Sequence, residues 1–135
     1  MKYPIAIEIG SETTAFGVQV PDLPGCFSAG DSFDEAFDSA EEAILCHIEG
    51  LMIAGEPIPP PKSAETHRLN PAFAGMVWGM VPIDLSRLED KAERVNITLP
   101  RRVLHMIDTE AKRQHTSRSG FIAEASLGYI AAQHG

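Results

Sequence analysis

The chain has 135 residues, of which 44% are hydrophobic, and a formal net charge of −8. This length suits one ordinary domain or two very small ones, with enough apolar residues for a globular core. No apolar run approaches the roughly 18 residues of a membrane span, and the first residues lack the long apolar stretch of a signal peptide. Cys26 and Cys46 are too few for a disulfide framework, so we expect a soluble cytoplasmic protein with two small buried thiols.

The charge is divided along the chain. Residues 1–61 carry one Lys against eleven acidic residues, a net charge of −10, whereas residues 94–135 carry six basic residues against three acidic ones, a net charge of +3. The first part should repel nucleic acid and attract basic partners, and the second part can tolerate phosphate.

Three strands and a helix are predicted in the first part. Alternating apolar residues over Tyr3–Gly10 and Thr14–Val20, with a polar turn between them, predict a hairpin, and Cys26–Gly30 predicts a short third strand. Ser32 followed three residues later by Glu35 is a capping box, which opens a helix with an apolar stripe. That stripe consists of Phe33, Phe37, Ala40, Ile44, Ile48 and Leu51, and Gly50 and Gly55 mark the end of the helix.

The middle of the chain is less regular. The prolines of "EPIPPPKS" predict an extended connection, and residues 63–76 predict a loop with at most one helical turn. Met76–Leu85 is apolar enough for a fourth strand that is buried on both faces. Ser86–Arg94 is charged, so we interpret residues 86–93 as a hinge between domains.

The tail combines one strand with two helices. Val95, Ile97 and Leu99 alternate with polar residues, Pro100 begins a helix that runs to about Gln114, and a second helix runs from about Arg118 to Gln133. The backbone of a lone strand needs a partner for its hydrogen bonds. The second helix is apolar around most of its circumference, and a tail of about forty residues is too small to bury it in a monomer. We therefore expect a homodimer whose two strands pair through Val95, Ile97 and Leu99.

This tail resembles the ribbon-helix-helix DNA-binding fold, in which two protomers pair their strands into an antiparallel ribbon that enters the major groove. The outward face of the ribbon would offer Arg94, Asn96 and Thr98 to base edges, since Arg favours guanine and Asn favours adenine. The start of the second helix would hold a backbone phosphate. The residues expected there are Ser117, Arg118 and Ser119.

The whole chain resembles the HicB antitoxins of bacterial and archaeal toxin-antitoxin modules. The resemblance is carried by "YPIAIEI", "PDLPGCFSAGDSFDEAFDSAEEAI", "GEPIPPP" and "VWGMVPIDL". It implies an α+β fold: residues 1–85 form a partial ribonuclease-H-like domain that neutralises a basic, mRNA-cleaving HicA-type toxin, and residues 94–135 form a ribbon-helix-helix domain that binds operator DNA and represses the module's own promoter. It leaves open whether the antitoxin assembles as a dimer or as a tetramer.

The same residues also allow other interpretations. A ribonuclease H fold suggests a nuclease, but apart from Glu8 the acidic residues lie near a turn or along one helix, so we expect no catalysis. No set of four ligands predicts zinc, and we expect no metal or cofactor. The acidic run Asp34, Asp38, Glu41 and Glu42 is either a solvated face or a toxin-facing one. The alternative function is an acidic dimeric adaptor, or a ribbon-helix-helix repressor without a toxin partner.

Overall fold

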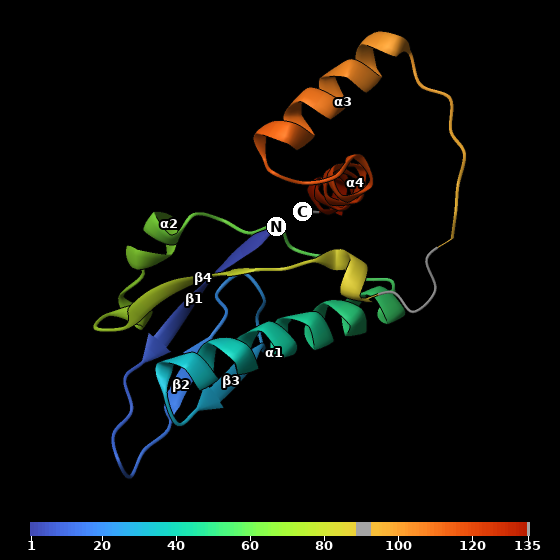
Figure 1. Cartoon of the computed structure of the whole chain (residues 1–135). Coiled ribbons are helices and arrows are strands. Elements are labelled where there is room, and N and C mark those ends of the chain that lie inside the picture. The colour runs from blue at the N-terminus through green and yellow to red at the C-terminus, as the bar shows by residue number, and fades with distance from the viewer. Residues whose placement is uncertain (89–92, 135) are drawn as a thin grey trace. The chain divides into compact units, whose positions relative to one another are not determined.

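The computed structural model describes residues 1–88 and 93–134, and the chain forms two compact units, Met1–Ile83 and Asp84–Gly135. The first unit is built on an antiparallel sheet of four strands in the order β3-β2-β1-β4 (Figure 1). The predicted hairpin and the third and fourth strands are confirmed. Their bounds are β1 Lys2–Glu8, β2 Phe16–Gln19, β3 Phe27–Gly30 and β4 Val77–Pro82.

Helix α1, Phe33–Ala54, begins at the predicted cap. The Ser32 side chain accepts a hydrogen bond from the Glu35 backbone N–H at 3.2 Å, and the Glu35 side chain accepts one in return from the Asp31 N–H at 3.3 Å. The helix ends at Gly55, whose φ of 70° suits a residue without a side chain. Gly50, which the sequence placed at the end, lies inside the helix.

The core lies between α1 and one face of the sheet. Ile5 and Ile7 of β1, and Ile44 and Ile48 of α1, have no exposed surface. The helix can approach β4 closely because Gly79 has no side chain there, and a Cβ atom at Gly79 would clash with the ring of Phe37. Packing of this density contributes roughly 1.5–3 kcal/mol for each large apolar side chain that is fully buried.

The opposite face of β4 is covered by two short helical segments, α2 Ala64–Arg68 and η1 Pro71–Phe73. The ring of Trp78 stacks on His67, with centroids 6.3 Å apart, and meets Phe73 edge to face. His67 Nε2 lies 3.0 Å from Oδ1 of the buried Asp22. The prediction of at most one helical turn in this region was therefore wrong, because the side chains of both segments pack on one tryptophan.

Strand β4 is not buried on both faces, as the sequence predicted. Val77 is 38% exposed and Met80 is 45% exposed. The layers on the two faces contact β4 only locally: Phe37 of α1 lies at Gly79, and His67 and Phe73 lie at Trp78 on the opposite face. Val77 and Met80 therefore keep part of their surface in water.

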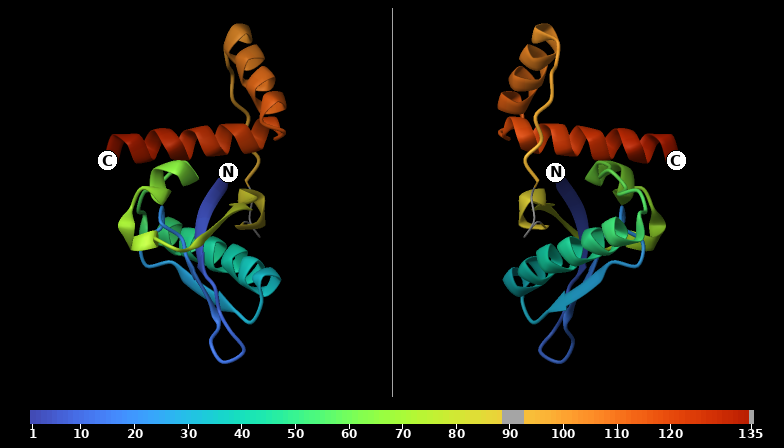
Figure 2. Two further views of the ribbon diagram at one scale, coloured as in Figure 1. Left: turned by 90° about the vertical axis from the view of Figure 1, so that its left-hand side faces the viewer. Right: turned by 90° about the vertical axis from the view of Figure 1, so that its right-hand side faces the viewer.

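The second unit contains η2 Leu85–Leu88 and two helices that cross at a wide angle, α3 Arg101–Arg113 and α4 Arg118–His134 (Figure 2). Both helices of the tail are confirmed, and Pro100 precedes α3 as its N-cap residue. The predicted hinge of residues 86–93 begins in η2, and its residues 89–92 lie outside the described part of the chain.

Candidate functional site

The segment expected to form the ribbon, residues 94–99, has no strand ladder in the single chain. Arg94, Asn96 and Thr98 are exposed, as base-reading residues must be. The apolar residues of the alternation are exposed too, Val95 to 69% and Ile97 to 60%. Strand pairing requires a second extended segment, and no described segment of the same chain pairs with residues 94–99.

Exposed apolar side chains continue along the two helices of the second unit. No residue of α4 is buried, and the exposed group comprises Val103 and Met106 of α3 and Tyr129 and Ile130 of α4. Ala111 is the buried residue of α3. Exposed apolar side chains concentrated on one pair of helices are typical of a surface that is buried against a partner.

The beginning of α4 carries the expected phosphate-binding residues. Ser117 caps the helix, because its side chain accepts the N–H of Gly120 at 3.0 Å and its carbonyl accepts the N–H of Phe121 at 2.9 Å. Arg118 and Ser119 are exposed in the first turn, where N–H groups have no acceptor inside the helix. These donors and the positive end of the helix dipole suit an anion.

Arg118 has a partner that the sequence analysis missed. Its Nε and Nη2 atoms donate hydrogen bonds of 2.8 Å to Oδ1 and Oδ2 of Asp108, respectively. The guanidinium on α4 and the carboxylate on α3 therefore form a bidentate ion pair. The bonds to Arg118 lower the pKa of the Asp108 carboxyl and raise that of the guanidinium. A phosphate that contacts Arg118 must replace this carboxylate or share the guanidinium with it.

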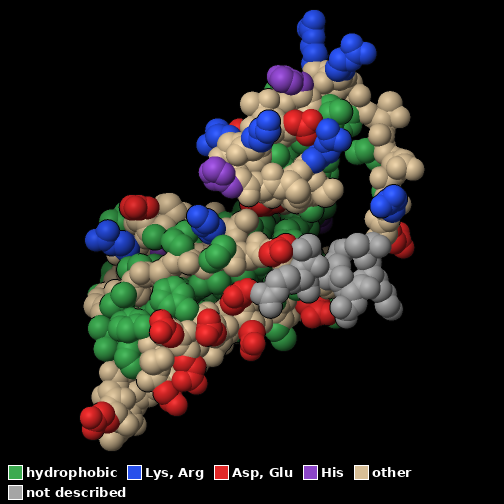
Figure 3. All heavy atoms as spheres, in the orientation of Figure 1, with side chains coloured by type: hydrophobic (Ala, Val, Ile, Leu, Met, Phe, Trp, Pro, Cys, Tyr) green, Lys and Arg blue, Asp and Glu red, His purple; other side chains and the backbone are tan. Residues whose placement is uncertain are grey.

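The acidic residues expected to face a partner line α1. Asp34, Asp38 and Glu42 are exposed and Glu41 is half-buried. Asp34, Asp38 and Glu41 follow an i, i+4, i+7 spacing, which places them in one row on the helix. Figure 3 shows acidic side chains gathered over α1 beside a group of hydrophobic ones.

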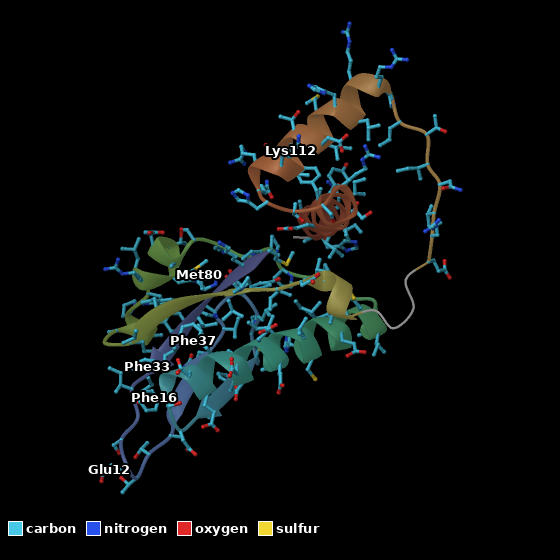
Figure 4. The ribbon with its side chains drawn as sticks, viewed as in Figure 1. Glu12, Phe16, Phe33, Phe37, Met80 and Lys112 are labelled. Carbon is cyan, nitrogen blue, oxygen red and sulfur yellow. The ribbon has the colours of Figure 1, made fainter. Side chains whose placement is uncertain are left out.

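Partly exposed hydrophobic side chains lie at the amino-terminal end of α1, and two of them, Phe33 and Phe37, belong to the apolar stripe that the sequence predicted for this helix. The rings of Phe16 and Phe33 meet at 4.8 Å between centroids, Phe37 covers Gly79, and Val77 lies two residues from Gly79 on the same face of β4. Figure 4 shows the three phenylalanines at the amino-terminal end of α1. We name Phe16, Phe33, Phe37 and Val77 the phenylalanine patch.

The two cysteines differ, although both were expected to be buried. Cys26 is 4% exposed, and burial raises the pKa of its thiol to about 11. Cys46 is exposed on α1, so the prediction for this residue was wrong. Both are free thiols.

Residues 1–88 and 93–134 include no group of three or more His, Cys, Asp or Glu side chains that could hold a metal ion. None of the helices in the same ranges is long and apolar enough to cross a membrane.

Comparison with known proteins identifies the class of protein to which this fold and these surfaces belong. Residues 3–126 match the HicB-like antitoxins of bacterial toxin-antitoxin systems. The chain belongs to the HicB-like antitoxin family. That family consists of antitoxins and not of enzymes, so the acidic residues of α1 are not assigned to catalysis.

Individual relatives cover nearly the whole chain. The crystal structure of the Burkholderia pseudomallei antitoxin HicB is 40% identical, with a TM-score of 0.81, over 96% of this chain and 98% of its own. An uncharacterized 14.9 kDa protein in the rep-hol intergenic region of Haemophilus phage HP1 is 40% identical over 96% of this chain and 98% of its own. The HicB family fold therefore extends through both units.

A solved toxin-antitoxin complex is also similar. The complex of HicA3 and HicB3 contains a chain that is 41% identical, with a TM-score of 0.55, over 62% of this chain and 99% of its own.

Proposed function

We propose that this HicB-family chain neutralises a HicA-type toxin through its first unit and represses its own operon through its second unit. The observation that carries the proposal is its similarity to a chain of the HicA3–HicB3 complex over 62% of its length. The charge distribution supports the same assignment. Met1–Ile83 carries three basic side chains against twelve acidic ones, a net charge of −9.

The first unit recognises its partner by opposite charge. An mRNA-cleaving toxin needs a cationic surface for the phosphates of its substrate, and an acidic inhibitor competes for that surface and accelerates encounter by long-range steering. Asp34, Asp38, Glu41 and Glu42 supply part of this charge on one helix. Residues 1–85 act as the neutralising domain, with a partial ribonuclease H fold and no catalytic role, and residues 86–93 act as the hinge.

Within the second unit, residues 94–135 form a ribbon-helix-helix domain that becomes complete only in a homodimer. The 69% and 60% exposure of Val95 and Ile97 supports this assignment, because two such segments in antiparallel pairing bury these side chains together with Leu99. Pairing leaves the alternate residues Arg94, Asn96 and Thr98 on the outer face, where they read base edges of operator DNA.

Backbone phosphate is held at the beginning of α4 by N–H groups around Ser117, Arg118 and Ser119. The Arg118 guanidinium already makes a bidentate contact with a carboxylate, a geometry that a phosphate can reproduce. Asp108 thus orients the guanidinium in the free protein and competes with DNA for it.

Co-expression with the adjacent gene tests the proposal. If that gene encodes the toxin, its expression alone arrests growth, and co-expression of this chain restores growth and allows the two proteins to be purified together. A chain that lacks residues 94–135, once shown to be folded, should still restore growth but should no longer bind the promoter. If the product of the adjacent gene is neither toxic nor bound, the chain is instead an acidic adaptor or a repressor without a toxin partner.

A further inference from the structure

We propose that the phenylalanine patch is the contact on which the basic toxin docks, with the acidic row of α1 as its charged border. The inference rests on the proposed function and adds to it the place of binding.

The phenylalanine patch is built from three elements. Phe16 is contributed by β2, Val77 by β4, and Phe33 and Phe37 by successive turns of α1. The rings of Phe16 and Phe33 are in edge-to-face contact, and Phe37 fills the space that Gly79 leaves open. Because these contacts tie the helix to two strands, the patch is held in place before any partner arrives.

Water reaches much of this surface. Phe33 is 39% exposed and Val77 is 38% exposed, while Phe16 and Phe37 are half-buried. Aromatic side chains that are fixed and partly exposed are typical centres of protein interfaces, where they enter pockets of the partner and lose their remaining water. The patch therefore has the chemistry of the apolar centre of an interface.

The border of the patch selects the partner. Asp34 and Asp38 directly follow Phe33 and Phe37 in the sequence, so the acidic row lies about 100° around α1 from the aromatic row. Figure 3 shows hydrophobic and acidic side chains next to each other on this face. An apolar centre with an acidic border complements a partner whose own apolar pocket is surrounded by Lys and Arg.

A second copy of the same surface is a poor occupant. Two patches face to face would bring two acidic rows together, on units that each carry a net charge of −9. Like charges across an interface disfavour the pairing. A cationic toxin meets the opposite condition, because its charge is complementary to the border while the apolar centre slows its dissociation.

The chain offers a matched pair of variants for the test. Val77→Lys places a positive charge in the patch, and Phe27→Lys places the same charge on the other face of the sheet, at a strand residue that is 65% exposed. Both residues lie on edge strands, which accept Lys well. The two variants change the net charge equally, so any general loss of electrostatic attraction is the same in both.

The experiment measures the dissociation constant between the full-length chain and the protein encoded by the adjacent gene, by calorimetry. Val77→Lys should weaken binding about thirtyfold or more, whereas Phe27→Lys should change it by less than about threefold. Circular dichroism and thermal melting show whether each variant is folded. If Val77→Lys does not fold, the nearly isosteric Val77→Thr should weaken binding about fivefold.

Three results would overturn the proposal. If both Lys variants weaken binding equally, or neither does, the toxin docks elsewhere although the antitoxin function stands. If Val77→Lys leaves toxin affinity unchanged but lowers the oligomeric state of the free chain in sedimentation, the patch contacts a second copy. If the wild-type chain does not bind the toxin at all, the proposed function fails together with the docking site.

Discussion

Replacement of Ile97 by Ala tests the pairing of two chains through residues 95–99. Full burial of an isoleucine side chain contributes about 1.5–3 kcal/mol. Ile97 is 60% exposed in the single chain, so its complete burial between two protomers contributes about 1–2 kcal/mol for each copy. Truncation to Ala removes most of this in both copies, about 2–3 kcal/mol per dimer, which weakens dimerisation about thirtyfold to somewhat more than a hundredfold.

Sedimentation over a dilution series measures the dimer dissociation constant directly. Asn96→Ala is the matched control, because Asn96 is the neighbouring residue on the opposite side of the segment and is exposed in the single chain. It should leave dimerisation unchanged. A dissociation constant for Ile97→Ala within about threefold of the wild-type value would refute pairing through this segment.

Three further predictions concern the DNA contacts and the thiols. Asn96→Ala should weaken DNA binding by about 1–3 kcal/mol at one base position, measured by competition between operator variants, and an equal loss on random DNA would remove Asn96 from the reading face. Arg118→Ala should weaken DNA binding to all sequences and reduce the dependence of the affinity on salt. Asp108→Asn should strengthen DNA binding several-fold, because no carboxylate then competes for the Arg118 guanidinium. Stronger binding by the first variant or weaker binding by the second would contradict a phosphate contact at Arg118. A thiol reagent at pH 8 should label the exposed Cys46 quickly, whereas Cys26, buried and with a pKa of about 11, should react only after unfolding, and rapid labelling of both would contradict its burial.

Local patterns in the sequence predicted most of the elements correctly. Ser32 and Glu35 mark the beginning of α1 because capping depends on neighbours three residues apart. The alternation in β1 and the proline before α3 are equally local signals. Features that depend on residues within one strand or one helical turn can therefore be predicted from a short stretch of sequence.

Features that depend on the arrangement of elements could not be predicted in this way. Val77 belongs to an apolar strand, and only the strand order shows that β4 lies at the edge of the sheet. Phe33 and Phe37 share the apolar stripe of α1, yet they remain partly exposed, whereas Ile44 and Ile48 of the same stripe are buried. Arg118 and Asp108 are ten residues apart on different helices, so their ion pair depends on the corner between α3 and α4.

Titration of the purified chain into an RNA cleavage reaction of the adjacent gene's product tests the central claim, neutralisation of a toxin, most directly. The account predicts that cleavage falls in proportion to the amount of chain added and stops when the toxin is saturated. Inhibition should reach the same end point with the Phe27→Lys variant. Undiminished cleavage in the presence of excess folded chain would contradict the account.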